Sequence, residues 1–99
     1  LKTNILPLQY GLKEILQLNP VSYNWINGST GENKIGLIAQ EVKQLIPEVI
    51  TGDEHQEVLG MNYAELVPVL INAVKEQQVQ INNIETRINN IQRKKDNRK

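Results

Sequence analysis

Isoleucines at alternating three- and four-residue intervals near the C-terminus constrain the fold of this chain more than any other feature. From Tyr63 onward no glycine interrupts the sequence, and apolar residues keep helical spacing for about thirty residues. Isoleucine at both core positions of the last heptads disfavours a two-stranded coil, so the pattern predicts a parallel trimeric coiled coil. The a and d positions of its seam are Val67, Leu70, Val74, Gln77, Ile81, Ile84, Ile88 and Ile91.

The length of this seam indicates that it contacts other copies of the chain. At 1.5 Å per residue, a helix from Val67 to Ile91 is about 36 Å long, which a body of this size cannot cover. The alternative is a helix folded back on its own domain, but the strict heptad spacing favours self-association. Gln77 at a d position is expected to cost stability while fixing register and strand number through hydrogen bonds across the threefold axis.

The size and composition of the chain lead to the same expectation. A chain of 99 residues with one Trp, three Tyr and no Phe builds only a thin monomeric core. It has no cysteine and no Cys- or His-rich metal site, so oligomerisation is the remaining common source of stability. No stretch approaches the roughly 20 consecutive apolar residues of a membrane span, and no signal peptide is recognisable. We therefore expect a soluble homotrimer without membrane contact.

Charge is unevenly distributed along the chain although the formal net charge is zero. Residues 87–99 hold six Lys or Arg and one acid, whereas the preceding residues hold five bases and ten acids. A basic tail can bind nucleic acid, and such binding would weaken steeply with salt. We interpret the tail instead as a solvated, fraying end, so nucleic acid is not an expected partner.

The residues before Tyr63 predict a small α+β head with an antiparallel sheet and short helices. Pro7 indicates an extended arm, whereas Pro20 and Pro47 each end a helix. Alternating large and polar residues predict strands, and clusters of Gly with polar residues predict turns. The expected elements are an arm at 1–9, a helix at 10–19, strands at 21–25 and 35–39, a helix at 40–46, and a hairpin of 49–51 with 58–61.

These elements divide the chain into a head at 1–62, a long coiled-coil helix at 63–94 and a disordered basic tail at 95–99. Asn62 is expected to cap the long helix, and Pro68 either lies in its first turn or kinks it. Apolar spacing assigns one face of the first strand and of the second helix to the core. The core residues expected there are Val21, Tyr23, Trp25, Ile38, Val42, Leu45 and Ile46.

Several other residues could in principle form a metal, catalytic or ligand site, but each has a simpler structural explanation. His55 lies among acids in a polar loop, where a solvated loop is a better explanation than a metal site. Ser22 and Ser29 form no credible triad with that histidine, so a conventional hydrolase is rejected. Tyr23 and Trp25 could stack on a sugar or a base, but their alternation makes them core residues first. No glycine-rich phosphate loop is present, and we expect neither metal nor cofactor.

Five segments of the chain occur in the order of a known family. They are residues 1–5, 20–25, 36–42, 47–49 and 63–71. Together they resemble the C-terminal intramolecular chaperone domain of phage endosialidases, tailspikes and tail fibres, over nearly the whole chain. The domain is also similar to the auto-cleaving segment of the myelin regulatory factors. Residues 36–42, Gly-Leu-Ile-Ala-Gln-Glu-Val, are the most specific element of the resemblance.

The resemblance implies a Ser-Lys peptidase that releases itself from an upstream fibre by autoproteolysis. In the family, the Ser of a Ser-Asp-x-x-x-Lys pattern is the nucleophile and the Lys is its general base. Lys2 matches that Lys, and Thr3, Asn4 and Ile5 continue the pattern. The Ser falls upstream of Leu1, so this chain alone is expected to be inactive. A Lys shielded by neighbouring chains can lose its proton near neutral pH, so trimerisation could gate cleavage.

The expected function is an intramolecular chaperone that drives trimerisation of an upstream fibre during assembly in the producing cell's cytoplasm. The parent protein would then reside in a virion tail fibre or at a cell surface. Gln40 and Glu41 are candidates to support the cleavage site, although a carboxylate at a helix start also suits the helix dipole. Lys2 could instead be an exposed residue of a frayed terminus. The alternative function is a permanent, non-cleaving trimerisation or adhesive tip.

Overall fold

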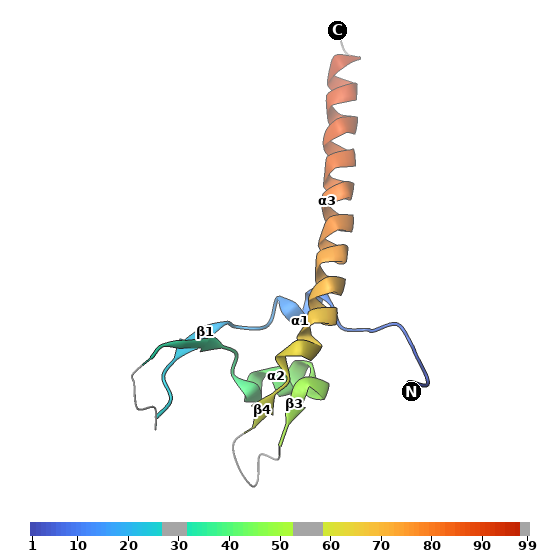
Figure 1. Ribbon diagram of the computed structural model, residues 1–99. Coiled ribbons are helices and arrows are strands. Elements are labelled where there is room, and N and C mark those ends of the chain that lie inside the picture. The colour runs from blue at the N-terminus through green and yellow to red at the C-terminus, as the bar shows by residue number, and fades with distance from the viewer. Residues whose placement is uncertain (27–31, 53–58, 98–99) are drawn as a thin grey trace.

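A long helix rises out of a small α+β head in the computed structural model, which describes residues 1–26, 32–52 and 59–97 (Figure 1). The radius of gyration is 20.5 Å and the principal extents are 70 × 41 × 22 Å. A compact domain of about 100 residues has a radius of gyration of only about 13 Å. The long helix therefore projects away from the head, and the alternative of a helix folded back on its own domain is wrong.

The long helix α3 spans Leu66–Asp96 and continues a 3-10 turn, η2, at Tyr63–Glu65. It therefore extends past residue 94, where the coil is expected to end. Pro68 lies in the first turn of α3, where its missing N–H leaves no helical hydrogen bond unmade. Asn62 occupies the N-cap position of η2, but its side chain makes no capping hydrogen bond and the N-cap of α3 is Glu65, so its predicted role as the cap of the long helix is wrong.

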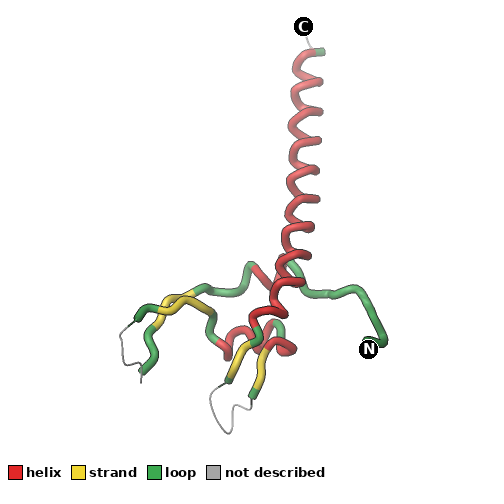
Figure 2. The backbone as a smooth tube through the Cα atoms, in the orientation of Figure 1, coloured by secondary structure: helices red, strands yellow, loops and turns green. Residues whose placement is uncertain are grey.

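Two short antiparallel strand pairs form the β part of the head (Figure 2). Strand β1 (Val21–Tyr23) pairs with β2 (Lys34–Gly36), and β3 (Ile50–Thr51) pairs with β4 (Gly60–Met61). Both predicted strand pairings are confirmed, although each strand is shorter than expected and the head has two sheets instead of one. The polar, Gly-containing segments that are expected to connect these strands, residues 27–33 and 52–57, lie mostly outside the described residues.

The prediction that the first strand buries its large side chains is wrong. Trp25 is 60% exposed, and Val21 and Tyr23 are only partly buried. The physical reason is that β1 and β2 form a two-stranded ribbon at the edge of the head, where no described layer covers their face (Figure 1). Trp25 instead packs edge-on against Tyr23, with ring centroids 5.3 Å apart.

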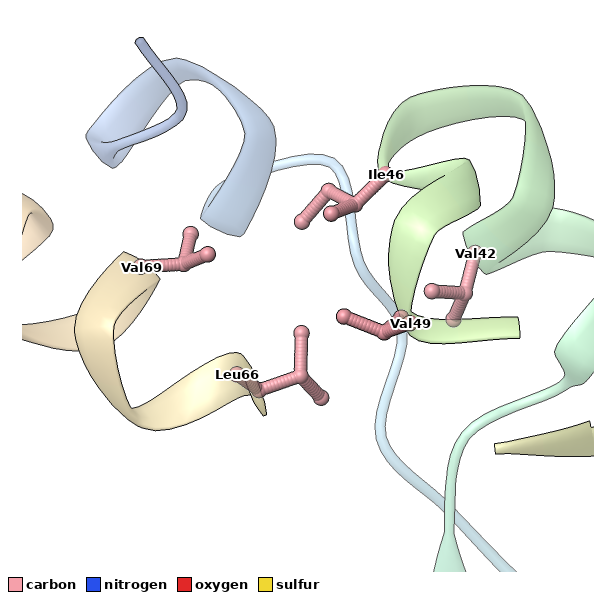
Figure 3. Close-up of a cluster of buried hydrophobic side chains, with 5 residues drawn as sticks. All are labelled: Val42, Ile46, Val49, Leu66 and Val69. Carbon is pink, nitrogen blue, oxygen red and sulfur yellow. The ribbon is translucent and has the colours of Figure 1, made fainter. Parts of the chain in front are cut away.

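The core lies where the second helix meets the start of α3. Helix α1 spans Leu12–Ile15, α2 spans Ala39–Leu45, and a 3-10 turn, η1, follows at Pro47–Val49. Five buried side chains from α2, η1, α3 and the link between α2 and η1 point toward one another (Figure 3). They are Val42, Ile46, Val49, Leu66 and Val69.

The predicted core positions of the second helix are confirmed in part. Val42 and Ile46 are each 1% exposed, and Leu45 is half-buried against the cluster. Ile38 is 39% exposed, so its assignment to the core is wrong. It has an extended backbone at the N-cap of α2, which begins one residue later, and its side chain lies along a surface cavity. Helical spacing therefore does not apply at this position.

Candidate functional site

Helix α3 carries two apolar stripes with the same spacing, displaced from each other by one residue. The first consists of Leu66, Val69 and Ala73, which are buried at 6%, 1% and 4% exposure. The second is the predicted seam, which starts at Val67. One residue corresponds to about 100° around a helix, so the stripes lie on different faces. The first stripe binds the chain's own head, and the second is left uncovered.

The predicted seam is exposed along its whole length in the single chain. Its apolar side chains are between 46% and 65% exposed, and Gln77 is also exposed. Beyond Ala73, no described residue of α3 is buried. The described part of one chain thus presents a long apolar stripe with nothing packed on it. The apolar members of the stripe are Val67, Leu70, Val74, Ile81, Ile84, Ile88 and Ile91.

The N-terminal arm carries Lys2 away from the head (Figure 1). Residues 1–9 form no helix or strand, and Lys2 is exposed. Asn4 has a φ of 53°, a left-handed conformation that asparagine tolerates better than most residues. Ile5 and Leu6 are 80% and 79% exposed, so the arm has apolar side chains without cover in the described part of one chain.

Gln40 and Glu41 lie in the first turn of α2, as the sequence predicts. Glu41 Oε1 accepts a hydrogen bond of 3.3 Å from Asn19 Nδ2, which ties α2 to the segment before β1. Gln40 lines a cavity of about 340 Å³ together with Tyr23, Trp25 and Tyr63. Among the described residues no hydrogen bond or ion pair joins Lys2 to either side chain. The single chain therefore does not assemble these candidates into one site.

Residues 8–12, the root of the arm, are bound to α3 by side chains that the sequence does not single out. Asn72 Nδ2 donates hydrogen bonds to the carbonyl oxygens of Leu8 at 3.2 Å and Tyr10 at 2.9 Å. Glu76 Oε2 accepts a hydrogen bond of 3.2 Å from the backbone N–H of Leu12. These contacts join residues 62 or 64 positions apart, and no motif in the sequence signals them.

A second contact holds the same region of the arm against the head. The Tyr10 hydroxyl donates a hydrogen bond of 2.7 Å to Glu48 Oε1. This hydrogen bond, with smaller effects of desolvation and of the negative charges of Glu48 and Glu14, raises the pKa of the Tyr10 phenol. Tyr10 and Glu48 also line a cavity of about 310 Å³ beside Val49 and Val69. The chain is thus fixed to the core from Tyr10 onward.

The described part of the chain contains no cluster suited to a metal ion, and it does not include two of the three residues of the rejected hydrolase triad. Residues 1–26, 32–52 and 59–97 contain no group of three His, Cys, Asp or Glu placed to hold a metal ion. His55 and Ser29 lie outside the described residues, and Ser22 is an exposed residue of β1. No described helix combines the length and apolarity needed to cross a bilayer.

Comparison with known proteins identifies relatives of this chain. Residues 1–51 match the family described as chaperone of endosialidase. The chain is also 26% identical, over 94 residues, to Long tail fiber protein Gp37 of Enterobacteria phage K3. The identity to Long tail fiber protein Gp37 of Enterobacteria phage T2 is the same. Both alignments cover 89% of this chain, but the chain spans only 8% and 7% of the length of these relatives.

Proposed function

Because this chain belongs to the chaperone of endosialidase family, we propose that it directs the folding and trimerisation of an upstream fibre. Its similarity to two phage long tail fibre proteins supports a role in fibre assembly. In this proposal the domain assembles with its fibre in the producing cell and releases itself by Ser-Lys cleavage. The mature fibre then belongs to the virion tail.

The observation that carries the trimerisation proposal is the division of α3 into two faces. The chain's own head takes up Leu66, Val69 and Ala73 and leaves the neighbouring a and d positions free. The seam keeps its spacing from the head to the last turns of the helix, which is expected of residues that pack against copies of themselves. Isoleucine at both core positions of the last heptads favours three parallel strands over two.

Covering the seam supplies a substantial driving force for assembly. Full burial of a Val, Leu or Ile side chain stabilises by about 1.5–3 kcal/mol, and roughly half of that remains available on each half-exposed seam residue. Each apolar seam position therefore contributes about 1 kcal/mol per chain, before the entropic cost of association. Three chains with seven such positions each provide a gain large enough to hold the C-terminal ends of a fibre together.

The proposed cleavage uses Lys2 as a general base. A neutral Lys2 amine takes the proton from the hydroxyl of a Ser upstream of this chain. The Ser oxygen then attacks the carbonyl carbon of the preceding peptide bond. The C–N bond breaks, the Ser nitrogen takes up the proton held by Lys2 and leaves as an amine, and the acyl group stays on the Ser oxygen as an ester. Water hydrolyses this ester, which releases the fibre with a new carboxylate and restores the Ser hydroxyl. A solvated Lys is protonated at neutral pH, since its usual pKa is about 10.4. Neighbouring chains that cover the apolar arm would desolvate Lys2 and favour the neutral amine.

The experiment that tests this proposal uses the full-length precursor, which includes the upstream Ser. Cleavage is followed by the mass of the released C-terminal fragment. Lys2→Ala is expected to slow cleavage by about 100-fold or more, the usual contribution of a general base. Lys13→Ala is the control, because Lys13 is an exposed Lys of α1 outside the arm. Unchanged cleavage in Lys2→Ala would remove Lys2 from the mechanism.

A permanent trimerisation or adhesive tip is the second candidate function. The observation that favours it is that the described single chain does not join Lys2 to Gln40 or Glu41. An unaltered precursor that forms trimers but releases no fragment would support this second function and refute self-cleavage.

A further inference from the structure

The arm that carries Lys2 is attached to α3 through Asn72 and Glu76. If assembly controls cleavage, an attachment of this kind has to link the coil to Lys2. We propose that Asn72 and Glu76 are positioning residues, which hold the root of this arm on α3 and so place Lys2 relative to the assembled coil. The inference rests on the proposed self-cleavage and adds to it the physical link between coil formation and catalysis. Neither residue touches the reacting atoms, so neither is a catalytic residue.

Both side chains bind backbone atoms, at the end of the arm and at the start of α1, and not side chains. The Asn72 amide bridges the carbonyl oxygens of Leu8 and Tyr10, and the Glu76 carboxylate accepts from the N–H of Leu12. Two points of attachment on successive helical turns fix both the position and the direction of the arm where it leaves α3. The seven residues before Leu8 have no comparable attachment in the described part of the chain.

Close approach at Gly11 strengthens this attachment. Gly11 is buried, and a Cβ atom at this position would overlap the Glu76 carboxylate. Its N–H donates to Glu14 Oε1 at 2.7 Å, while the N–H of Leu12 donates to Glu76. The first N–H groups of a helix have no backbone partner within it, so Glu14 of α1 accepts from one of them and Glu76 of α3 accepts from the other. The backbone therefore passes directly against the long helix.

The attachment lies on the side of α3 that faces away from the seam. Asn72 and Glu76 are each two residues from the seam residue Val74, which is about 200° around the helix. A partner helix packed on the seam therefore leaves both hydrogen-bonding groups in place. Six residues of extended chain from Leu8 to Lys2 reach at most about 20 Å, whereas packed helix axes are about 8–10 Å apart. Lys2 can thus reach a neighbouring chain from a root that stays on its own helix.

The test measures cleavage rate and trimer content for variants of the full-length precursor. Asn72→Ala and Glu76→Ala are expected to slow cleavage about tenfold, as the loss of one or two hydrogen bonds predicts, while the precursor remains trimeric. Glu76→Gln keeps an oxygen acceptor for Leu12 and is expected to cleave within about twofold of the unaltered rate. Asn83→Ala is the matched control, because Asn83 lies one heptad after Glu76 on the exposed part of α3.

A pH profile separates positioning from general support of the fold. Water favours the charged form of an amine, so displacing the arm into solvent should raise the pH at which cleavage is half-maximal in Asn72→Ala. The inference is overturned if Asn72→Ala and Glu76→Ala cleave at the control rate, or if trimer content falls in parallel with cleavage and the pH midpoint stays unchanged. An unaltered precursor that does not cleave overturns the self-cleavage proposal itself, which the variants cannot do.

Discussion

Val74 and Val79 allow a direct test of the seam, because the same substitution can be made at two similar sites on one helix. Val74 is 63% exposed and lies at position a, whereas Val79 is 58% exposed and lies at position f. In a single chain the two residues have similar surroundings. In a coiled coil only Val74 becomes covered by partner chains. Val74→Ala should therefore weaken assembly, and Val79→Ala should not.

The size of the effect follows from the area that assembly covers. Val→Ala removes the equivalent of two CH₂ groups, each worth about 0.8 kcal/mol when fully buried. Because 63% of Val74 is still to be covered, the loss is about 1 kcal/mol per chain and about 3 kcal/mol per trimer. This raises the dissociation constant of the trimer roughly a hundredfold. The higher helix propensity of Ala stabilises both variants alike and cancels in the comparison.

Sedimentation equilibrium over a concentration series measures this change. The dissociation constant of a trimer varies with the square of its midpoint concentration, so the Val74→Ala midpoint should rise roughly tenfold. The Val79→Ala midpoint should stay with that of the unaltered chain. Equal shifts for both variants would refute the heptad register, and an unaltered chain that remains monomeric at micromolar concentration would refute the seam altogether.

Two further predictions concern contacts of the head. Tyr63→Phe removes the acceptor for the N–H of Leu37, a hydrogen bond of 3.1 Å, and should lower the free energy of unfolding in urea by about 0.5–1 kcal/mol; no change would show that water replaces the hydroxyl. Tyr10 holds its proton more tightly when folded, because its hydrogen bond to Glu48 raises its pKa above 10.0. The stability from this contact is thus complete below about pH 10 and lost as pH rises through the raised pKa. Glu48→Gln should lower the midpoint of tyrosinate absorbance, and an unchanged midpoint would contradict the contact.

The long helix is predictable from the sequence because its signal is local and repeated. Each turn from Leu66 to Asp96 has helix-forming residues, and no glycine interrupts them. The same spacing also identifies the core residues Val42, in α2, and Ile46, which directly follows α2, because they are close in sequence. Turn residues between apolar runs predict a hairpin, so the pairing of β1 with β2 and of β3 with β4 is also predictable from local sequence.

Burial in the first strand pair is not predictable from alternation alone. Alternation shows that Val21, Tyr23 and Trp25 share a face, but not whether a second layer covers that face. In the described chain none does, and Trp25 remains exposed. Ile38 illustrates a related problem, because it precedes α2 with an extended backbone, so helical spacing from Val42 does not give the direction of its side chain.

The attachment of the arm lies beyond sequence reasoning for a different reason. Asn72 and Glu76 are ordinary polar residues of a helix surface until the chain folds Leu8 and Leu12 against them. Contacts between residues more than sixty positions apart depend on how the head is oriented on the helix. Lys2, by contrast, is recognisable only through its family pattern, since nothing in its surroundings in the described single chain marks it as a base.

The one-residue offset between the two stripes of α3 also fixes the angular placement of the heads in the proposed trimer. Each head packs on its own α3 through Leu66, Val69 and Ala73. In the proposed trimer, the adjacent face of that helix points to the threefold axis. Inserting one residue between Ala73 and Val74 would turn each head by about 100° about its helix, whereas inserting a whole heptad after Gln77 would only lengthen the stalk. The stalk can therefore change length in whole heptads without turning the heads, whereas the count of residues where head and stalk meet sets their direction.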